Sequence, residues 1–276
     1  MTLDPDQLGQ SKADLAETLR TLRRRAGLSG VRLAQRCNMS QSKISKIETG
    51  KTVPTLVDVE RILRALDAPA GLIAEVGALT RIANTEWQDF RSMRRKGLEK
   101  KQSELADLER MSAEFRFFLP TIITSLLSTP EYIRATLANV PGDHSQAISR
   151  KLDRQSVLYD ASKRFTFLLT EQAVRWPLLP RPAMAMQIDR LVSVSRLPSV
   201  RLGVLPLAGH VPLTPLNVFT VYDRSLATVE TSTGVMVLKD ARDVESYLAE
   251  FSSYEAHALW GDAARIRLEE WAQLFR

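Results

Sequence analysis

The stretch SQSKISKIETGK, residues 40–51, brings hydroxyls, an amide and ammonium groups together at short spacing. On a helix that turns about 100° per residue, Ile44 and Ile47 share one face and Ser42 points almost directly away from them. The rest of that outer face carries further polar side chains, which are Gln41, Ser45, Lys46 and Thr49. An amide can pair with adenine, and a hydroxyl or an ammonium group can reach base edges or phosphates. These residues therefore predict a helix whose outer face contacts DNA.

Two short helices joined by a tight turn would position this face. Ser29 is the predicted N-cap of a helix from about Gly30 to Arg36. Ser40 is the predicted N-cap of the next helix, which ends near Gly50. The first of these helices would cross the DNA backbone and offer free N–H groups at Ser29 and Gly30 to a phosphate. The pair is thus a predicted helix-turn-helix.

Three further helices are predicted around this pair. Ser11, with Asp14 three residues on, has the pattern of a capping box, so the first helix is expected to start there after a polar segment that frays. Thr55 and Asp58 are expected to open a fourth helix. A short apolar fifth helix is expected to end at about Val76. The apolar stripes of these helices predict an all-α core.

Residues 12–67 resemble the phage-repressor-like (XRE) helix-turn-helix family. The resemblance is carried by LRTLRRRAGLS, LAQRCNMSQSKISKIETGK and PTLVDVERILRAL. It implies that three side chains read bases, namely Gln41, Ser42 and Lys46. It also implies a set of residues near phosphates, namely Arg23, Ser29, Gly30 through its backbone, Lys43, Thr49 and Lys51. Glu48 would be structural near the end of the helix.

Two features limit the DNA affinity that we expect. The family commonly opens its second helix with Gln, whereas this chain has Gly30, which leaves the backbone contact possible but removes a side-chain clamp. Residues 1–80 carry a formal charge of +3, from 12 Lys and Arg minus 9 Asp and Glu. Non-specific attraction to DNA should therefore be weak, and specificity should depend on a few groove contacts.

The whole chain is predicted to be α+β, in three parts. These are an N-terminal all-α five-helix repressor-like domain (11–78), a charged helical connector (79–111) and a C-terminal mixed α/β domain (112–276). In the third part, Thr129 and Pro130 predict the start of a helix. Short β-branched runs predict strands at 164–171, 200–207, 217–223, 226–232 and 234–240. Helical patterns cover 144–162, 183–196, 240–259 and 262–275.

A second resemblance covers residues 85–272. SAEFRFFLPTIITSLLSTPEYIRATL, LDRQSVLYDASKRFTFLLTEQAVRW, LPSVRLGVLPL and FTVYDRSLATVE are similar to a poorly characterised domain behind many actinobacterial helix-turn-helix regulators. Those regulators are often described as antitoxin-like and tend to be encoded beside a small partner protein. The resemblance implies a sensing or partner-binding domain. This chain departs from it between Ile123 and Thr129, with ITSLLST where the family tends to have VPGLLQT.

The sequence shows no catalytic or metal-binding motif. His144, His210 and His257 are scattered, and no Cys/His/Asp cluster has metal-ligand spacing. We therefore expect no enzymatic activity, no cofactor and no metal. Glu171, after an apolar strand, is the most conspicuous isolated carboxylate. Two interpretations stay open: it caps the following helix, or it contacts a ligand or partner or has a catalytic role.

The composition indicates which cellular compartment and which kind of partner we expect. The 276 residues include 44% hydrophobic residues, one cysteine and a formal charge of +6, values that suit a globular protein with an anionic partner. The first residues lack the pattern of a signal peptide, and no apolar run is long enough to cross a bilayer. Cys37 alone excludes an internal disulfide framework and fits a reducing compartment. We expect a soluble, cytoplasmic protein without a membrane partner.

The sequence favours a sequence-specific DNA-binding transcriptional regulator. One helix-turn-helix covers few base pairs, so a homodimer on double-stranded operator DNA is expected. The C-terminal domain would receive a small-molecule or protein signal. The alternative is an antitoxin-type protein that binds a small protein encoded nearby and regulates its own operon. An enzyme tethered to DNA is the third possibility.

Overall fold

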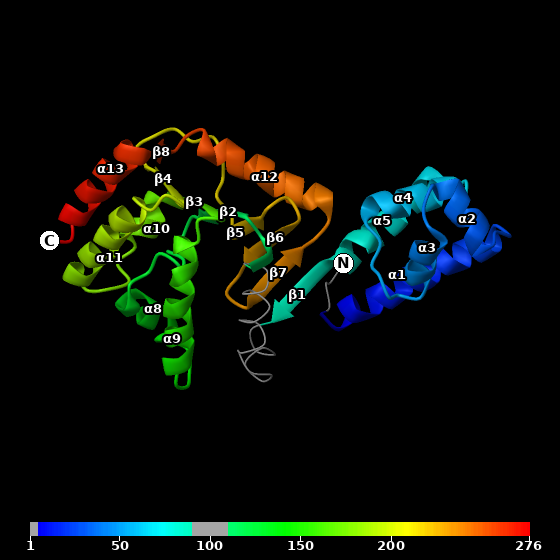
Figure 1. The fold of residues 1–276 in the computed structure, drawn as a ribbon, viewed down its shortest axis with the longest axis horizontal. Coiled ribbons are helices and arrows are strands. Elements are labelled where there is room, and N and C mark those ends of the chain that lie inside the picture. The colour runs from blue at the N-terminus through cyan, green and yellow to red at the C-terminus, as the bar shows by residue number, and fades with distance from the viewer. Residues whose placement is uncertain (1–4, 90–109) are drawn as a thin grey trace. The chain divides into compact units, whose positions relative to one another are not determined.

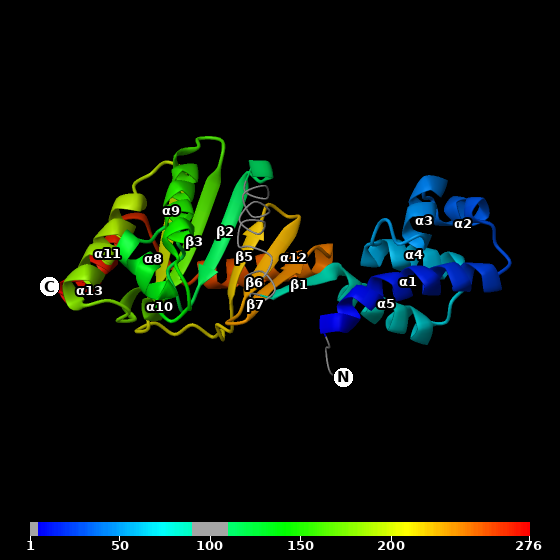
Figure 2. The same ribbon diagram turned by 90° about the horizontal axis from the view of Figure 1, so that it is seen from below.

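The computed structural model describes residues 5–89 and 110–276, which fold as two compact units. The first unit comprises the chain up to Gln88 together with Met236–Asp243. The second unit comprises Asp89–Val235 and Val244–Arg276. Figures 1 and 2 show the elements of each unit from two sides. The predicted α+β class is confirmed, with helices in the first unit and a mixed sheet with helices in the second.

Five helices build most of the first unit, as predicted. They are α1 (Pro5–Arg25), α2 (Gly30–Cys37), α3 (Gln41–Glu48), α4 (Leu56–Ala65) and α5 (Ala70–Asn84). Their apolar faces meet in one core, whose buried members include Leu15, Leu19, Leu33, Ile44, Ile47, Val59, Leu63 and Val76. The short helices α2 and α3 are therefore held by packing rather than by their own propensity.

Local capping signals start α2, α3 and α4 where the sequence predicts. Ser29 and Ser40 each accept a hydrogen bond at 3.2 Å from the backbone N–H three residues on. Thr55 and Asp58 form a reciprocal capping box at the start of α4. Gly50, just beyond α3, has φ +70°, a conformation that glycine adopts without steric cost.

The first helix begins earlier than predicted. α1 starts at Pro5, so Ser11 lies inside the helix and the predicted capping box at Ser11 is wrong. Proline is well tolerated in the first turn because the N–H groups there have no partner within the helix. Residues 5–10, predicted to fray, are accordingly helical in the structure.

The fifth helix is longer than predicted, and a strand follows it. Val76 and Ala83 are each 1% exposed, so the apolar face that anchors α5 continues past Val76. The amide of Asn84 donates to the carbonyl oxygens of Pro54 and Thr80, both at 2.9 Å, where the helix ends. The next residues form β1 (Thr85–Asp89), although a helical connector was predicted there. The rest of the predicted connector, 90–109, lies outside the described residues.

A distant segment completes the first unit. β1 neighbours β7 (Gly234–Leu238), whose residues from Met236 onward belong to this unit. The carboxylate of Asp240, 3% exposed, accepts a hydrogen bond at 3.3 Å from the N–H of Leu56. Leu56 opens α4, so Asp240 satisfies one of the N–H groups that every helix start leaves without a partner. Arg242 also pairs with Glu60 at 2.8 Å.

The second unit is built on a mixed sheet. Its strands follow the order β7-β6-β5-β2-β3-β4-β8. Their bounds are β2 Glu114–Leu119, β3 Arg164–Thr170, β4 Val200–Leu205, β5 Val218–Tyr222, β6 Leu226–Glu230 and β8 Leu259–Trp260. β2, β3 and β4 are parallel, whereas β5 runs antiparallel to β2 and to β6. The carboxyl ends of the three parallel strands therefore meet at one edge of the sheet.

The sequence predicted strands β3 to β7 but missed the central one. β2 lies between β3 and β5, and its aromatic side chains stack on those of β3. The ring centroids of Phe115 and Phe165 are 4.7 Å apart, and those of Phe117 and Phe167 are 4.8 Å apart. This stack fixes the register of the sheet centre. The two-residue strand β8 was also missed.

The helices of the second unit follow the predicted pattern with shifted ends. They are α8 (Pro130–Leu137), α9 (Ser145–Asp153), α10 (Glu171–Arg175), α11 (Arg181–Val194), α12 (Ala241–Glu255) and α13 (Gly261–Gln273). The predicted helix 144–162 is α9 followed by a 3-10 turn, Arg154–Tyr159. Thr129 caps α8 with Pro130 at its first position, as predicted. Tyr254 of α12 stacks on Phe118 of β2 with ring centroids 4.2 Å apart, which places α12 on one face of the sheet.

Candidate nucleic-acid interface

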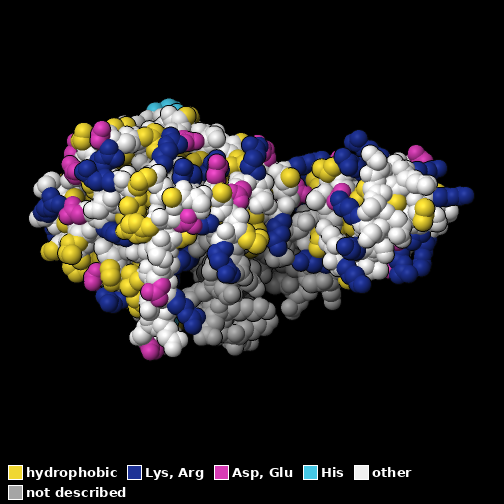
Figure 3. All heavy atoms as spheres, viewed as in Figure 1, with side chains coloured by type: hydrophobic (Ala, Val, Ile, Leu, Met, Phe, Trp, Pro, Cys, Tyr) yellow, Lys and Arg dark blue, Asp and Glu magenta, His cyan; other side chains and the backbone are white. Residues whose placement is uncertain are grey.

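The outer face of α3 is free to meet another molecule. Ile44 and Ile47, each 1% exposed, anchor the helix in the core. The predicted base-reading residues are exposed together on the opposite side, and they are Gln41, Ser42 and Lys46. Within the described residues these three side chains make no hydrogen bond or ion pair. Lys and Arg side chains are frequent on the face of the first unit that Figure 3 shows.

A part-buried ion pair connects the end of α3 to α1. Arg23 donates to Glu48 through two nitrogens, with Nε–Oε1 at 2.6 Å and Nη2–Oε2 at 2.8 Å. Its Nη1 donates to the carbonyl oxygen of Leu28 at 2.7 Å. The hydrogen bond to Glu48 raises the pKa of Arg23. Glu48 thus makes a structural contact near the end of α3, as the resemblance implied. Arg23, which the resemblance placed near a phosphate, is paired with Glu48 within the unit.

Lys43 is held by a carboxylate of α4. Its Nζ lies 2.7 Å from Oδ1 of Asp58, whose side chain is 8% exposed. Burial by itself raises the pKa of Asp58, but hydrogen bonds from Lys43 and Thr55 outweigh it, and the pKa is lowered. The ammonium group of Lys43 is therefore engaged within the unit, and a phosphate would have to share it with Asp58.

This ion pair gives a testable pH dependence. Because the folded-state pKa of Asp58 lies below its ordinary 3.8, the stabilisation is present above that value and is lost as pH falls toward the lowered pKa. We expect Asp58→Asn to destabilise the first unit at neutral pH and to remove part of the acid sensitivity below about pH 4. Urea unfolding followed by circular dichroism at several pH values measures both effects.

The matched control for Asp58 is Asp67→Asn. Asp67 is an exposed carboxylate in the same unit, at a left-handed position (φ 54°) that asparagine also accepts. Its removal should leave the acid sensitivity of the unit almost unchanged. Equal pH profiles for the Asp58 and Asp67 variants would contradict the role given to the ion pair.

The start of α2 has backbone N–H groups that can bind a ligand. The hydroxyl of Ser29, the N-cap residue, accepts a hydrogen bond from the N–H of Arg32, and Ser29 is exposed. No hydrogen bond is formed within the described residues by the N–H groups of Gly30 and Val31, so they can meet a phosphate. A Cβ atom at Gly30 would meet nothing within 4 Å, so the missing side-chain clamp is not imposed by sterics.

Two predicted phosphate residues lie at the end of α3. The hydroxyl of Thr49 donates to the carbonyl oxygen of Ser45 at 2.8 Å, so its proton is already used. Lys51 is exposed and makes no ion pair within the described residues. Arg32, the third residue of α2, is a further exposed cation in this unit, and the sequence analysis did not single it out.

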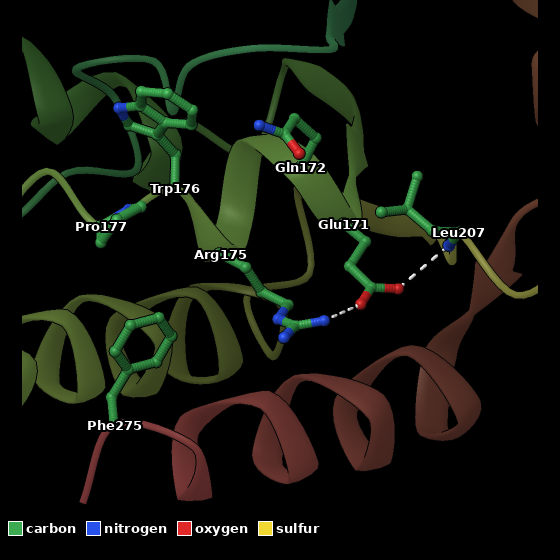
Figure 4. A pocket seen from close by; sticks show the side chains of 7 residues that line it. All are labelled: Glu171, Gln172, Arg175, Trp176, Pro177, Leu207 and Phe275. Carbon is green, nitrogen blue, oxygen red and sulfur yellow. Dashed lines mark hydrogen bonds and ion pairs between the residues drawn. The ribbon is translucent and has the colours of Figure 1, made fainter.

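Glu171 lies far along the chain, in the second unit. It is the first residue of α10, directly after β3, and only 7% of it is exposed. Its carboxylate forms an ion pair with Arg175 and accepts a hydrogen bond at 3.0 Å from the N–H of Leu207. Thr170, and not Glu171, is the N-cap of this short helix. Figure 4 shows that Glu171 lines a pocket with these neighbours.

Two kinds of feature are absent from the described residues. Among them, no group of three His, Cys, Asp or Glu side chains could hold a metal ion. Nor is any helix in the described ranges long and apolar enough to cross a membrane.

Solved structures offer only a distant likeness. NucT from Helicobacter pylori shares 7% identity at a TM-score of 0.37, with 64% of this chain and 98% of that one covered. A phospholipase D family member, Nuc from Salmonella typhimurium, shares 8% identity at a TM-score of 0.36, and the match covers 64% of this chain and 97% of that one. TrmBL2, an archaeal chromatin protein, shares 11% identity at a TM-score of 0.34, and the match covers 73% of this chain and 66% of that one. Such low TM-scores carry no functional argument.

Family comparison is more informative. None of the curated proteins matches the chain. Residues 14–76 match a family described as a helix-turn-helix domain. That match and the exposed face of α3 indicate DNA binding, and with it transcriptional regulation. Residues 102–270, more than half of the chain, match the family described as a domain of unknown function (DUF5753), and the chain therefore belongs to that family.

Proposed function

We propose that this protein is a sequence-specific DNA-binding transcriptional regulator of the phage-repressor-like (XRE) type. The observation that carries the proposal is the outer face of α3. Gln41, Ser42 and Lys46 are exposed there without partners in the described residues, on a helix that the core holds at Ile44 and Ile47. Side chains of this kind can approach and read base edges in the major groove.

The regulator is proposed to act as a homodimer. One recognition helix contacts only a few base pairs, and each mismatched pair typically costs about 1–3 kcal/mol, so one helix gives little selectivity in a genome. Two copies on half-sites one helical turn apart would double the contacts. The second unit is proposed to receive the signal, has no catalytic role in this proposal, and needs no cofactor.

A gel shift on the DNA upstream of the protein's own gene tests the proposal. We expect the wild type to shift this DNA at physiological salt and in the presence of random competitor DNA. A Ser42→Ala/Lys46→Ala variant should lose the specific shift, because both side chains lie on the free face of α3. A Glu17→Ala variant, altered at an exposed position of α1, should behave like the wild type. Equal shifts with all three proteins would reject the proposal.

An antitoxin-type function is the second candidate. Exposed apolar side chains on the second unit favour it, since Trp176 is 55%, Leu207 66% and Leu216 76% exposed. A small protein encoded nearby would cover such side chains and alter DNA binding. Adding that neighbour to the same gel shift separates the two functions. Release or strengthening of the shift supports the second, and an unchanged shift supports the first alone.

A further inference from the structure

A pocket of about 290 Å³ opens at the carboxyl ends of the parallel strands β3 and β4. Its walls come from α10, which directly follows β3, from Leu207, two residues after β4, and from Phe275 near the end of the chain. In open sheets with parallel strands, ligands bind at this edge, because loops and helix starts converge there. The pocket belongs wholly to the second unit.

One end of the pocket presents the guanidinium group of Arg175. Both carboxylate oxygens of Glu171 are engaged, one by Arg175 and one by the N–H of Leu207. Glu171 therefore has a partner at each oxygen, and one of these partners is Arg175. A guanidinium has five N–H donors, and within the described residues only Nη1 of Arg175 is engaged. The side chain of Arg175 is 43% exposed, so its other donors are accessible to a second anion.

The other end of the pocket is apolar. Figure 4 shows Trp176 and Phe275 on one side of Arg175, and Glu171 with Leu207 on the other. Trp176, on the side away from Glu171, is 55% exposed and leaves a large apolar surface in water. Covering such surface is favourable, and an aromatic ring stacks well on an indole.

We infer that this pocket binds a small organic anion with an apolar, preferably aromatic, body. The carboxylate would take the free donors of Arg175, and the ring would lie against Trp176 and Phe275. A volume of about 290 Å³ is near the lower limit of known ligand pockets and suits a bicyclic carboxylate. As the place where a signal is received, the site depends on the function proposed above, but its binding chemistry is tested separately.

Calorimetric titration of the full chain with 1-naphthoate tests the inference. We expect binding in the micromolar to millimolar range, as small ligands of this size give. The neutral 1-naphthamide has the same ring and should bind at least about ten-fold more weakly, because it lacks the charge that pairs with Arg175. No binding of naphthoate, or equal binding of the two probes, would overturn the inference.

Two substitutions should act in opposite directions on naphthoate. Arg175→Gln removes the cation and should weaken binding by at least about ten-fold. Glu171→Gln keeps an acceptor for Arg175 but removes the competing negative charge, so naphthoate should bind a few-fold more tightly. Naphthamide should respond to neither. A general loss of structure would weaken both probes in both variants, so opposite signs identify the charge pair and equal signs reject it.

Arg224→Gln is the matched control. Arg224 is a well-exposed arginine of the same unit that pairs with Glu245 at 2.6 Å. This variant should bind naphthoate like the wild type. The gel shift separates the two proposals: naphthoate binding without any DNA shift would reject the regulator and keep the pocket, whereas a DNA shift without naphthoate binding would reject the pocket alone.

Discussion

Glu48→Ala should destabilise the first unit by about 3 kcal/mol, the lower end of the cost of breaking a buried ion pair, because both side chains keep some exposure. The side chain of Arg23 is only 13% exposed and would keep a single acceptor, the carbonyl oxygen of Leu28. The guanidinium cannot be deprotonated in a protein, so Arg23 would stay charged after its carboxylate partner is removed. Because the pair connects the end of α3 to α1, α3 should also lose order.

The chain carries its own reporter for this effect. Cys37 is the sole cysteine, is buried in the core of the first unit, and has a pKa raised by burial, so it reacts slowly with thiol reagents while the unit is closed. Glu48→Ala should increase its labelling rate by about a hundred-fold or more.

Two further variants complete this experiment. Glu17→Ala alters a carboxylate that is 64% exposed and lies 3.9 Å from Arg20, so the labelling rate should hardly change. Adding Arg23→Leu to Glu48→Ala should recover part of the stability, because it removes the unpaired charge. Labelling of Glu48→Ala at the rate of the Glu17→Ala control would disprove a structural role for the pair.

Lys46→Ala should cost about 1–3 kcal/mol in operator binding and much less on random DNA. Lys46 is exposed on the free face of α3 and makes no ion pair within the described residues, so its ammonium group is available to a base edge. The measurement is a binding isotherm by fluorescence anisotropy on operator and on random duplexes, at several salt concentrations.

Lys51→Ala is the matched comparison for Lys46. Lys51 is also an exposed lysine, just beyond the end of α3, and is predicted to contact a phosphate. Its loss should weaken binding to both DNA sequences equally and reduce the slope of log K against log salt concentration by about one. If Lys46→Ala shows the same equal loss on both duplexes, its base-reading role fails.

Local signals made much of the first unit predictable. The caps at Ser29, Ser40 and Thr55 depend on residues at most three positions away, and all three start a helix in the structure. The burial of Ile44 and Ile47 follows from their helical spacing. The exposed outer face of α3 follows from the same periodicity, which is why the candidate interface could be found without a structure.

Contacts between distant residues were beyond such reasoning. Lys43 and Asp58 lie on different helices, and nothing in the pattern indicates that one neutralises the other. The central strand β2 was missed for a related reason: Phe117 pairs with Phe167 on one side and with Thr220 on the other. Its stability comes from these neighbours and not from its own six residues.

The hydrogen bond between Leu56 and Asp240 has a consequence for synthesis of the protein. These residues are 184 positions apart, so the DNA-binding unit lacks its last segment until the ribosome has made most of the chain. At typical translation speeds that delay is roughly 10 to 40 s. Helices α2 and α3 need only nearby contacts and can form much earlier. A nascent chain should therefore present its recognition helix well before the start of α4 has its final acceptor.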